Sequence, residues 1–352
     1  MPFPMSRKAA GITPYVPGEQ PAQGRYIKLN TNENPYPPSP KAVQAIARAA
    51  QGPLGLYPPP GCEALKAAIA QVEGVRPDQV FVGNGSDEVL AMIFLAFFDP
   101  GSPIAFPDVT YSFYPVYAHL YGIDFRAIPL REDWRLDLAA MRDFPGDLIF
   151  PNPNAPTACY APLEDVQQLL RARAGRMVVV DEAYIAFGGQ SATALLDQYE
   201  NLLVVRTLSK SHALAGLRVG YAIGSPACIS ALERVKNSFN SYTLDQLALA
   251  GATAAVLDVD YTRANCQRIV ATRTWFSQRL LQMGFEMPAS MANFVFPRHR
   301  DHPGAELFAR LREGGVLVRH FAAKRTEDHL RITIGTDADM HQVAELLGRI
   351  VG

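Results

Sequence analysis

Two apolar runs enclose a polar segment in residues 202–223, which read LLVVRTLSKSHALAGLRVGYAI. The runs Leu202–Val205 and Val219–Ile223 carry no charged residue and are rich in β-branched side chains. Uninterrupted runs of this kind are typical of strands buried on both faces of a sheet. The stretch therefore predicts two buried strands with a polar segment, containing Lys210, between them.

The same alternation extends towards the N-terminus. Short apolar strands are predicted at 79–82, 103–106, 148–150 and 177–180, and helices at 87–98, 108–121 and 163–173. Strands buried on both faces and separated by helices form a mostly parallel sheet covered by helices. The sequence thus predicts an α/β fold.

The pattern changes on both sides of this region. Residues 1–40 are rich in proline and predict an extended arm with little helix. After about residue 255 a long Arg-rich helix is predicted at 261–283, followed by short strands at 293–296, 316–318 and 330–334 and by helices at 304–313 and 337–350. We expect an N-terminal arm over 1–40, a large domain over 41–255 and a small α+β domain over 256–352.

Composition excludes several classes of protein. The 352 residues carry 33 Lys and Arg against 34 Asp and Glu, so the basic excess of a nucleic-acid-binding protein is missing. The longest apolar run, Val89–Phe98, has ten residues, whereas a membrane-spanning helix needs about 20. No secretory signal is recognisable. The four cysteines are far apart and form no CxxC motif, which indicates reduced thiols in a cytoplasmic protein and no metal site.

Polar residues follow the predicted strands where ligands bind in open α/β sheets. Gly85-Ser86-Asp87 begins a helix, Asp181 and Tyr184 follow one strand, and Lys210 follows another, eight residues before Arg218. Each feature alone is usually a cap, a turn or a solvated charge. Together they match one ligand, pyridoxal 5′-phosphate, which has a phosphate, a cationic ring nitrogen, a phenolic oxygen and a carbonyl that reacts with an amine.

Six motifs then resemble a known family. The segment around Lys210 resembles the lysine motif of fold-type I pyridoxal-phosphate-dependent aminotransferases, and Asp181-Glu182-Ala183-Tyr184 resembles their Asp–Tyr pair. Four further motifs resemble histidinol-phosphate aminotransferases in particular: 29–35 (LNTNENP), Tyr57-Pro58, 83–88 (GNGSDE) and 330–335 (LRITIG). The resemblance extends from Pro14 to Arg331. It implies a seven-stranded, mostly parallel sheet in the large domain.

The resemblance also implies roles for individual residues. Lys210 would bond covalently to the cofactor and move a proton to and from the substrate Cα. Asp181 would keep the ring nitrogen protonated, and Tyr184 would bind the phenolic oxygen. The implied cofactor-binding set is Gly85, Ser86, Asp87, Tyr111, Asn154, Asp181, Tyr184, Thr207, Ser209, Lys210, Arg218 and, across a subunit interface, Tyr57. A residue shared in this way implies a homodimer.

One motif departs from the family pattern. The usual Asn-Pro-Thr-Gly is replaced by Ala155-Pro156-Thr157-Ala158, so that the asparagine that contacts the phenolic oxygen maps to Ala155. Asn154, one residue earlier, is the candidate to take over this contact and to touch the substrate.

The resemblance assigns substrate binding to Arg331, Arg319 and Tyr15. In the family the arginine at Arg331 holds the histidinol phosphate in one half-reaction and the glutamate carboxylate in the other. A dianionic phosphate takes several strong donors, which fits two arginines and a tyrosine. The expected reaction converts L-histidinol phosphate and 2-oxoglutarate into imidazole acetol phosphate and L-glutamate, a step of histidine biosynthesis.

Three alternatives stay open on the sequence alone. The same fold would serve an aromatic amino-acid aminotransferase, and the aromatic residues near the site do not discriminate because imidazole also stacks on aromatic rings. A lyase resembling threonine-phosphate decarboxylase would also bind a phosphate. A pyridoxal-phosphate-sensing regulatory domain usually carries a DNA-binding module, for which the Pro-rich N-terminal 40 residues are too short.

Overall fold

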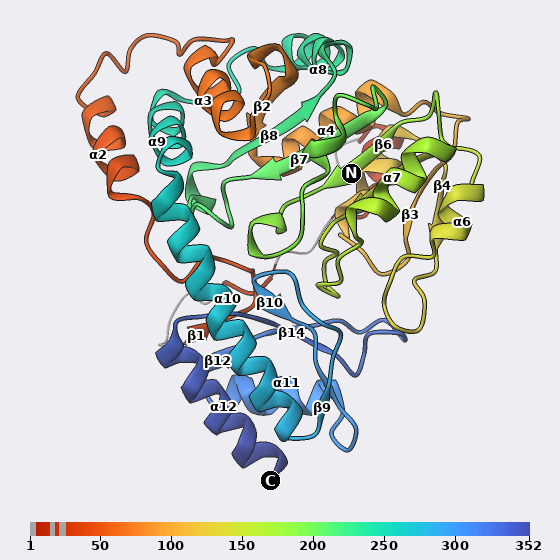
Figure 1. Ribbon diagram of the computed structural model, residues 1–352, viewed down its shortest axis with the longest axis vertical. Helices are drawn as coiled ribbons and strands as arrows, with labels where there is room; N and C mark the ends of the chain where they lie inside the picture. Colours follow the sequence, from red (N-terminus) through yellow and green to blue (C-terminus); the bar gives the residue numbers. More distant parts are fainter. Residues whose placement is uncertain (1–4, 15–17, 21–25) are drawn as a thin grey trace.

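The computed structural model describes residues 5–14, 18–20 and 26–352. Its larger part is built on a seven-stranded sheet with the strand order β2-β8-β7-β6-β5-β3-β4 (Figure 1). The strands are β2 (Val80–Asn84), β3 (Ile104–Pro107), β4 (Phe125–Ile128), β5 (Asp147–Pro151), β6 (Val178–Asp181), β7 (Leu202–Thr207) and β8 (Val219–Gly224). The five strands from β7 to β4 in this order are parallel, whereas β8 runs antiparallel to both β2 and β7. The predicted mostly parallel sheet is therefore confirmed.

Helices cover both faces of this sheet, because its strands present apolar side chains in both directions. Val178 and Val180 of β6 belong to one hydrophobic cluster and Val179 to the other. The first cluster includes residues of α2 (Pro40–Ala49), α3 (Glu63–Glu73), α6 (Leu138–Asp143), α7 (Leu163–Ala172) and α9 (Gln246–Leu257). The second includes residues of α4 (Gly85–Phe97), α5 (Phe113–Tyr121) and α8 (Pro226–Phe239).

The long helix α10 (Val259–Gln282) leads from this part into a smaller one (Figure 1). The smaller part contains α11 (Gly304–Glu313), α12 (Asp337–Val351), β9 (Phe285–Glu286), β10 (Phe294–Val295), β11 (Arg298–His299), β12 (Val316–Leu317), β13 (Arg319–His320) and β14 (Leu330–Thr333). Strand β14 pairs antiparallel with both β10 and β13. The third hydrophobic cluster lies between these strands and helices α10, α11 and α12.

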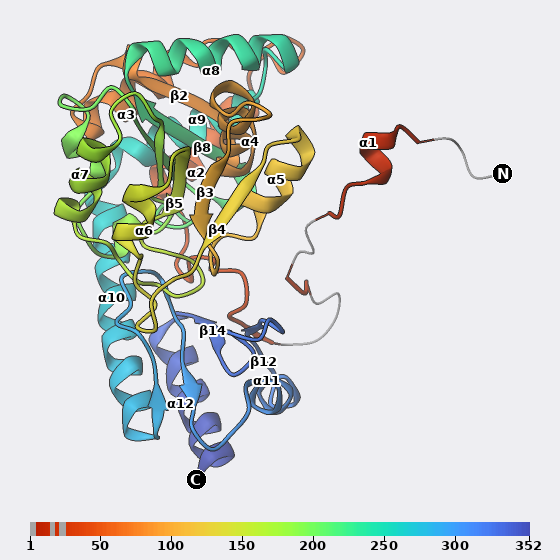
Figure 2. The same cartoon turned by 90° about the vertical axis from the view of Figure 1, so that its right-hand side faces the viewer.

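The N-terminal segment joins the smaller part. Strand β1 (Ile27–Lys28) pairs in parallel with β12, more than 280 residues later in the chain. The short helix α1 (Arg7–Ala10) lies on the α5 side of the molecule in Figure 2, and Nζ of Lys8 is 5.7 Å from the centroid of the Tyr121 ring. Single 3-10 turns occur at Pro77–Gln79, Ile185–Phe187, Ala192–Leu195 and Ala215–Leu217. Over the residues that the structure describes, no helix has both the length and the apolar character needed to cross a bilayer.

Some elements differ from the prediction. The helix expected from Asp108 begins only at Phe113, because the Asp108 side chain accepts hydrogen bonds from the backbone N–H groups of Val109 and Leu130 and holds the intervening chain in a loop. Strand β4 was not predicted, since it lies at the sheet edge and includes the exposed Arg126. Helices α8 and α9 were not predicted either, and the long helix begins two residues earlier than expected.

Candidate active site

A cavity of about 180 Å³ lies at the carboxyl ends of the parallel strands. It is lined by Thr31, Glu33, Ser86, Asp87, Tyr111, Pro151, Ala155, Asp181, Ala183, Tyr184, Thr207, Ser209, Lys210, Ala215 and Arg218. Pro151, Asp181 and Thr207 are the last residues of β5, β6 and β7, which is where an open α/β sheet binds its ligand. The structure thus brings nine of the predicted cofactor-binding residues into one cavity.

Asp181 occupies a fully buried end of the cavity. Its Oδ1 accepts a hydrogen bond from the backbone N–H of Ala183 (3.1 Å), and its Oδ2 accepts one from the hydroxyl of Tyr114 (3.1 Å). Burial raises the pKa of the carboxyl from its ordinary value of 3.8 to about 6, although both hydrogen bonds act in the opposite direction. A cation placed beside this carboxylate would offset the cost of burying its charge.

Lys210 contributes an amine to the middle of the cavity. Its Nζ donates a hydrogen bond to the backbone carbonyl of Thr31 at 3.1 Å. Burial, followed by the positive charge of Arg331, lowers the pKa of this amine to about 8. A lowered pKa leaves more of the amine neutral, and therefore nucleophilic, near neutral pH.

Another part of the cavity suits an anion. Here α4 begins at Gly85, and the first backbone N–H groups of a helix attract phosphate. Space in this part is tight: a Cβ on Gly85, whose φ is +81°, would lie 2.5 Å from Nη2 of Arg218, and a Cβ on Gly220 would lie 2.3 Å from the backbone nitrogen of Ser86. Glycine at both positions therefore lets β8 and the Arg218 guanidinium approach the helix start.

Asp87 binds two side chains in the part of the cavity that suits an anion. Its Oδ2 forms an ion pair with Nη2 of Arg218 at 3.0 Å, and its Oδ1 accepts the hydroxyl of Tyr111 at 2.6 Å. Nearby, the Thr207 hydroxyl donates to Oγ of Ser209 at 3.0 Å and accepts the Ser209 backbone N–H at 3.1 Å. Two hydroxyls, an arginine and a helix N-terminus thus surround the space where a phosphate fits.

The cavity offers a partner for each reactive or charged group of pyridoxal phosphate. A buried carboxylate at one end matches a cationic ring nitrogen, and the amine of Lys210 matches the carbonyl. The glycine-lined helix start with Arg218 matches the phosphate. The donor set therefore fits this cofactor.

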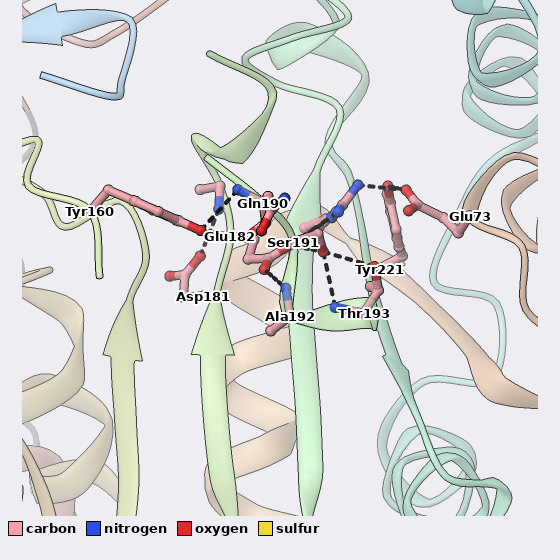
Figure 3. A network of polar contacts seen from close by, with 11 residues as sticks. Glu73, Tyr160, Asp181, Glu182, Gln190, Ser191, Ala192, Thr193 and Tyr221 are labelled. Atoms are coloured by element: carbon pink, nitrogen blue, oxygen red, sulfur yellow. Dashed lines mark hydrogen bonds and ion pairs between the residues drawn. The ribbon is translucent and has the colours of Figure 1, made fainter. Parts of the chain in front are cut away.

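A buried ionic network fixes the ends of three strands beside the cavity (Figure 3). Arg206, next to Thr207 at the end of β7, pairs with Glu182 (3.1 Å) and with Glu73 (2.7 Å). Tyr221 of β8 donates its hydroxyl to Glu73 at 2.8 Å. Glu182 directly follows Asp181, and it also accepts bonds from the Ser191 hydroxyl and the Ala192 backbone, both at 2.6 Å. The network holds Asp181 and Thr207 at a fixed spacing.

Two arginines lie side by side in the smaller part. Arg319 of β13 is directly opposite Arg331 of β14 in the strand register. Their guanidinium carbons lie 5.8 and 5.7 Å from the centroid of the Phe321 ring. Nη2 of Arg331 also donates to the backbone carbonyl of Asn30 at 2.9 Å. The pair concentrates positive charge near Lys210, whose pKa is lowered in part by the charge of Arg331. Tyr15, the third predicted substrate contact, lies outside the described residues.

Comparisons with known proteins agree with this geometry. Residues 25–347 match the family model of class I and II aminotransferases. The chain is 54% identical over 342 residues, 96% of both chains, to histidinol-phosphate aminotransferase 1 of Bordetella parapertussis. It is 52% identical over 355 residues, 99% of both chains, to histidinol-phosphate aminotransferase 2 of Dechloromonas aromatica.

The chain belongs to the histidinol-phosphate aminotransferase family. Solved structures share the fold of this aminotransferase. The histidinol-phosphate aminotransferase of Sinorhizobium meliloti, solved with pyridoxal 5′-phosphate, has a TM-score of 0.88 at 24% identity and covers 99% of this chain and 97% of its own. The aspartate aminotransferase of Thermus thermophilus with maleate has a TM-score of 0.84 at 21% identity, covering 99% of this chain and 100% of its own. The predicted fold-type I architecture is therefore confirmed.

Asn154, expected to contact the cofactor and the substrate, lies next to Ala155 in this aminotransferase. Ala155 lines the cavity, whereas the amide nitrogen of Asn154 donates to the backbone carbonyl of Val109 and to Oγ1 of Thr157, both at 2.9 Å. Both amide hydrogens of Asn154 are thereby used. The bond to Val109 holds the loop that leads to Tyr111.

Tyr57 lies away from the cavity of its own chain. Its side chain is 80% exposed, and its ring stacks on Tyr242 with a centroid distance of 4.5 Å. The structure therefore does not bring Tyr57 together with the other predicted cofactor-binding residues within one chain.

Several residues at the site were not predicted. Thr31 and Glu33 line the cavity, Asn32 donates to the Tyr184 hydroxyl at 2.9 Å, and Tyr114 donates to Asp181. The first three belong to a motif that was recognised without any role for its members. A signal for Tyr114 exists in principle, because a buried tyrosine usually has a partner for its hydroxyl.

Proposed function

We propose that this chain catalyses the transfer of an amino group between L-histidinol phosphate and 2-oxoglutarate, with pyridoxal phosphate as the cofactor. The observation that carries the proposal is the pairing of Arg319 with Arg331 on adjacent strands. A phosphate near neutral pH has about −1.5 to −2 charges and several acceptor oxygens, and two guanidinium groups match it. Relatives above 50% identity that are histidinol-phosphate aminotransferases support this substrate and its place in histidine biosynthesis.

Pyridoxal phosphate supplies a carbonyl that bonds to amines and a cationic ring that withdraws electrons from the substrate Cα. The protein residues provide the rest. Asp181 holds the proton on the ring nitrogen, and burial of this carboxylate strengthens its attraction for that cation. Lys210, whose pKa is lowered to about 8, accepts the proton from the substrate Cα at its Nζ. It then delivers this proton to the cofactor carbon that carried the carbonyl. Tyr184 donates its hydroxyl hydrogen to the phenolic oxygen of pyridoxal phosphate.

Different residues bind the phosphate of the cofactor and the phosphate of the substrate. The start of α4, Ser209 and Arg218 bind the cofactor phosphate at one end of the cavity. Arg319 and Arg331 bind the substrate phosphate, and Arg331 alone also binds the α-carboxylate of glutamate. This division lets one site accept two unlike amino donors.

We also propose a homodimer in which Tyr57 completes the neighbouring active site. Residues 53–60 lie against 236–246, as shown by the bonds from Gln246 to the Leu56 carbonyl and from Lys236 to the Pro60 carbonyl. Large apolar side chains of this surface are exposed: Leu54, Leu56, Tyr57, Phe239 and Tyr242. Burial of such a surface against a second copy is favourable.

We also propose a division of the chain into three parts and a cytoplasmic location. The division into an arm (1–40), a large domain (41–255) and a small domain (256–352) is supported by the cores, since two clusters draw on residues 42–256 and the third mainly on 266–350. The four cysteines are free thiols, which is typical of the reducing cytoplasm.

A half-reaction screen tests the substrate. The purified enzyme with bound cofactor is mixed separately with histidinol phosphate, histidinol, glutamate, phenylalanine and threonine phosphate, and the absorbance of the cofactor is followed. We expect rapid reaction with histidinol phosphate and glutamate and a much weaker one with histidinol. A preference for phenylalanine would favour an aromatic aminotransferase, and release of CO2 from threonine phosphate would favour a lyase.

Matched variants then locate the phosphate site. Arg319→Ala should raise the KM for histidinol phosphate roughly 10- to 100-fold, as expected for lost charged hydrogen bonds, while the KM for histidinol stays unchanged. Arg331→Ala should impair both histidinol phosphate and glutamate. Arg298→Ala is the control, because this half-exposed arginine pairs with Glu286 at the surface of the same domain. A normal KM for histidinol phosphate in Arg319→Ala would place the phosphate elsewhere.

A further inference from the structure

Consecutive residues of the N-terminal segment contact three different side chains of the site. The backbone carbonyl of Asn30 accepts a bond from Arg331, and the carbonyl of Thr31 accepts one from Lys210. The side-chain amide of Asn32 donates to the hydroxyl of Tyr184 at 2.9 Å. Of these contacts, only the last uses a side chain of the segment, so it alone depends on the type of residue in the sequence.

The hydrogen bonds around Asn32 determine which way its amide points. The Thr333 hydroxyl oxygen accepts the backbone N–H of Asn32 at 3.0 Å, so its own hydrogen is available to donate. That hydrogen goes to Oδ1 of Asn32, also at 3.0 Å. An amide whose oxygen faces Thr333 must turn its nitrogen to Tyr184. Both Asn32 and Thr333 are buried, so water does not compete for these bonds.

This orientation controls the hydrogen of the Tyr184 hydroxyl. An amide N–H can only donate, so the oxygen of Tyr184 acts as the acceptor towards Asn32. The hydroxyl hydrogen is then directed away from Asn32. The ring of Tyr184 packs edge-on against Phe294, with centroids 5.0 Å apart, and its side chain lines the cofactor cavity.

We propose that Asn32 is a positioning residue that, held by Thr333 of β14, orients the Tyr184 hydroxyl so that it donates its hydrogen to the phenolic oxygen of the cofactor. This rests on the proposed function only in that the cofactor is pyridoxal phosphate, and it does not depend on the amino donor. Thr333 belongs to β14 of the smaller part, and Tyr184 follows β6 of the larger part. The hydrogen bonds from Thr333 through Asn32 to Tyr184 therefore couple the placement of β14 to the orientation of the Tyr184 hydroxyl.

Backbone conformation offers a competing reason for asparagine at this position. Asn32 has φ +56°, in the left-handed region that asparagine and glycine tolerate better than other residues. Asn32→Gly separates the two explanations, because glycine adopts this conformation but lacks the amide. Asn32→Asp keeps the shape of the side chain and replaces the donor by an acceptor.

The test is a pH titration of the absorbance of the bound cofactor with no amino donor present. A hydrogen bond to the phenolic oxygen withdraws charge from it, so the nitrogen that joins Lys210 to the cofactor loses its proton more easily. Loss of that bond should raise the midpoint by about one pH unit, a tenfold change in proton affinity. We expect this rise in Asn32→Gly, at least as large a rise in Asn32→Asp, and a smaller one in Thr333→Val.

The double variant with Tyr184→Phe distinguishes positioning from general destabilisation. If Asn32 acts through Tyr184, Asn32→Gly adds no further shift once the hydroxyl is gone. Asn201→Asp is the control for an asparagine change far from the cavity, where the amide binds the carbonyls of Arg173 and Arg176, and it should leave the midpoint unchanged. An unchanged midpoint in Asn32→Gly, or fully additive shifts in the double variant, would overturn the proposal, and neither result depends on whether histidinol phosphate is the substrate.

Discussion

Tyr114 donates its phenolic hydrogen to Oδ2 of Asp181 across 3.1 Å, and both side chains are buried. The bond lowers the pKa of the carboxyl, against the larger upward effect of burial. The helix α5 thereby influences the charge of a residue at the end of β6, although about 70 residues separate the two in the sequence.

Tyr114→Phe should therefore raise the pKa of Asp181 further and reduce the ionised fraction near neutral pH. We expect kcat/KM to fall about tenfold, in line with the loss of one hydrogen bond to a charged group, and its acid limb to move to higher pH. A pH series of kcat/KM measures both effects. Tyr160→Phe, whose hydroxyl binds the Gln190 backbone at the surface, is the control, and an unmoved acid limb in Tyr114→Phe would contradict the assigned role.

Asp181→Asn should stabilise the cofactor-free protein. A carboxyl whose folded pKa is raised from 3.8 to about 6 binds protons more tightly when folded, so it costs stability above pH 6 and this cost disappears as the pH falls from 6 to 4. We expect the variant to have a free energy of unfolding higher by on the order of 2 kcal/mol at pH 7, with the difference vanishing near pH 4. Denaturant titrations at both pH values measure it, and a variant that is less stable at pH 7 would argue against a burial-dominated carboxyl.

The same substitution should nearly abolish transamination. A neutral amide does not hold the proton on the ring nitrogen, and removal of such an electrostatic partner typically costs roughly 3–5 kcal/mol of transition-state stabilisation. The rate constant of the half-reaction with histidinol phosphate measures the loss, at equal cofactor occupancy. Near-normal rates would show that Asp181 is not the partner of the ring nitrogen.

Lys210 is predicted to be the residue that binds the cofactor covalently. Borohydride reduction followed by peptide mapping should place the label on Lys210. Because its pKa is lowered to about 8, the rate of cofactor capture by the cofactor-free protein should rise through pH 8 and level off above it, instead of rising up to pH 10 or beyond. A label on another lysine would refute the site as a whole.

Shared active sites predict complementation between two inactive variants. Tyr57→Ala and Lys210→Ala subunits, unfolded and refolded together, should regain activity, because one of the two sites in a mixed dimer then carries both native residues. Each variant refolded alone is the control. Mixtures no more active than these controls would show that Tyr57 does not serve the neighbouring site.

Residues that belong to local motifs could be predicted from the sequence. Asp181 ends one buried strand and Lys210 follows another, and the carboxyl ends of parallel strands meet at one edge of the sheet. Arg218 directly precedes β8, which runs antiparallel to β7, so the start of β8 lies at the same edge. The strands themselves were recognisable because both faces are apolar. The edge strand β4 was missed for the opposite reason, since it is largely exposed.

Contacts between distant segments could not be predicted in this way. The bond from Asn32 to Tyr184 and the ion pair of Arg206 with Glu73 each join residues more than 100 positions apart. No spacing rule links such pairs, because the folded backbone determines them. The hydrogen bond of the Asn154 amide with the carbonyl of Val109, 45 positions earlier, likewise exists only in the folded protein.

The parallel pairing of β1 with β12, together with the bonds between Asn32 and Thr333, has a consequence for biosynthesis. A growing polypeptide leaves the ribosome N-terminus first, so the segment at residues 27–34 waits for about 300 further residues before its partners exist. Until β14 is complete, Thr333 is absent and does not orient Asn32 towards Tyr184. All seven strands of the large sheet are therefore synthesised before the partners that fix the segment at residues 27–34.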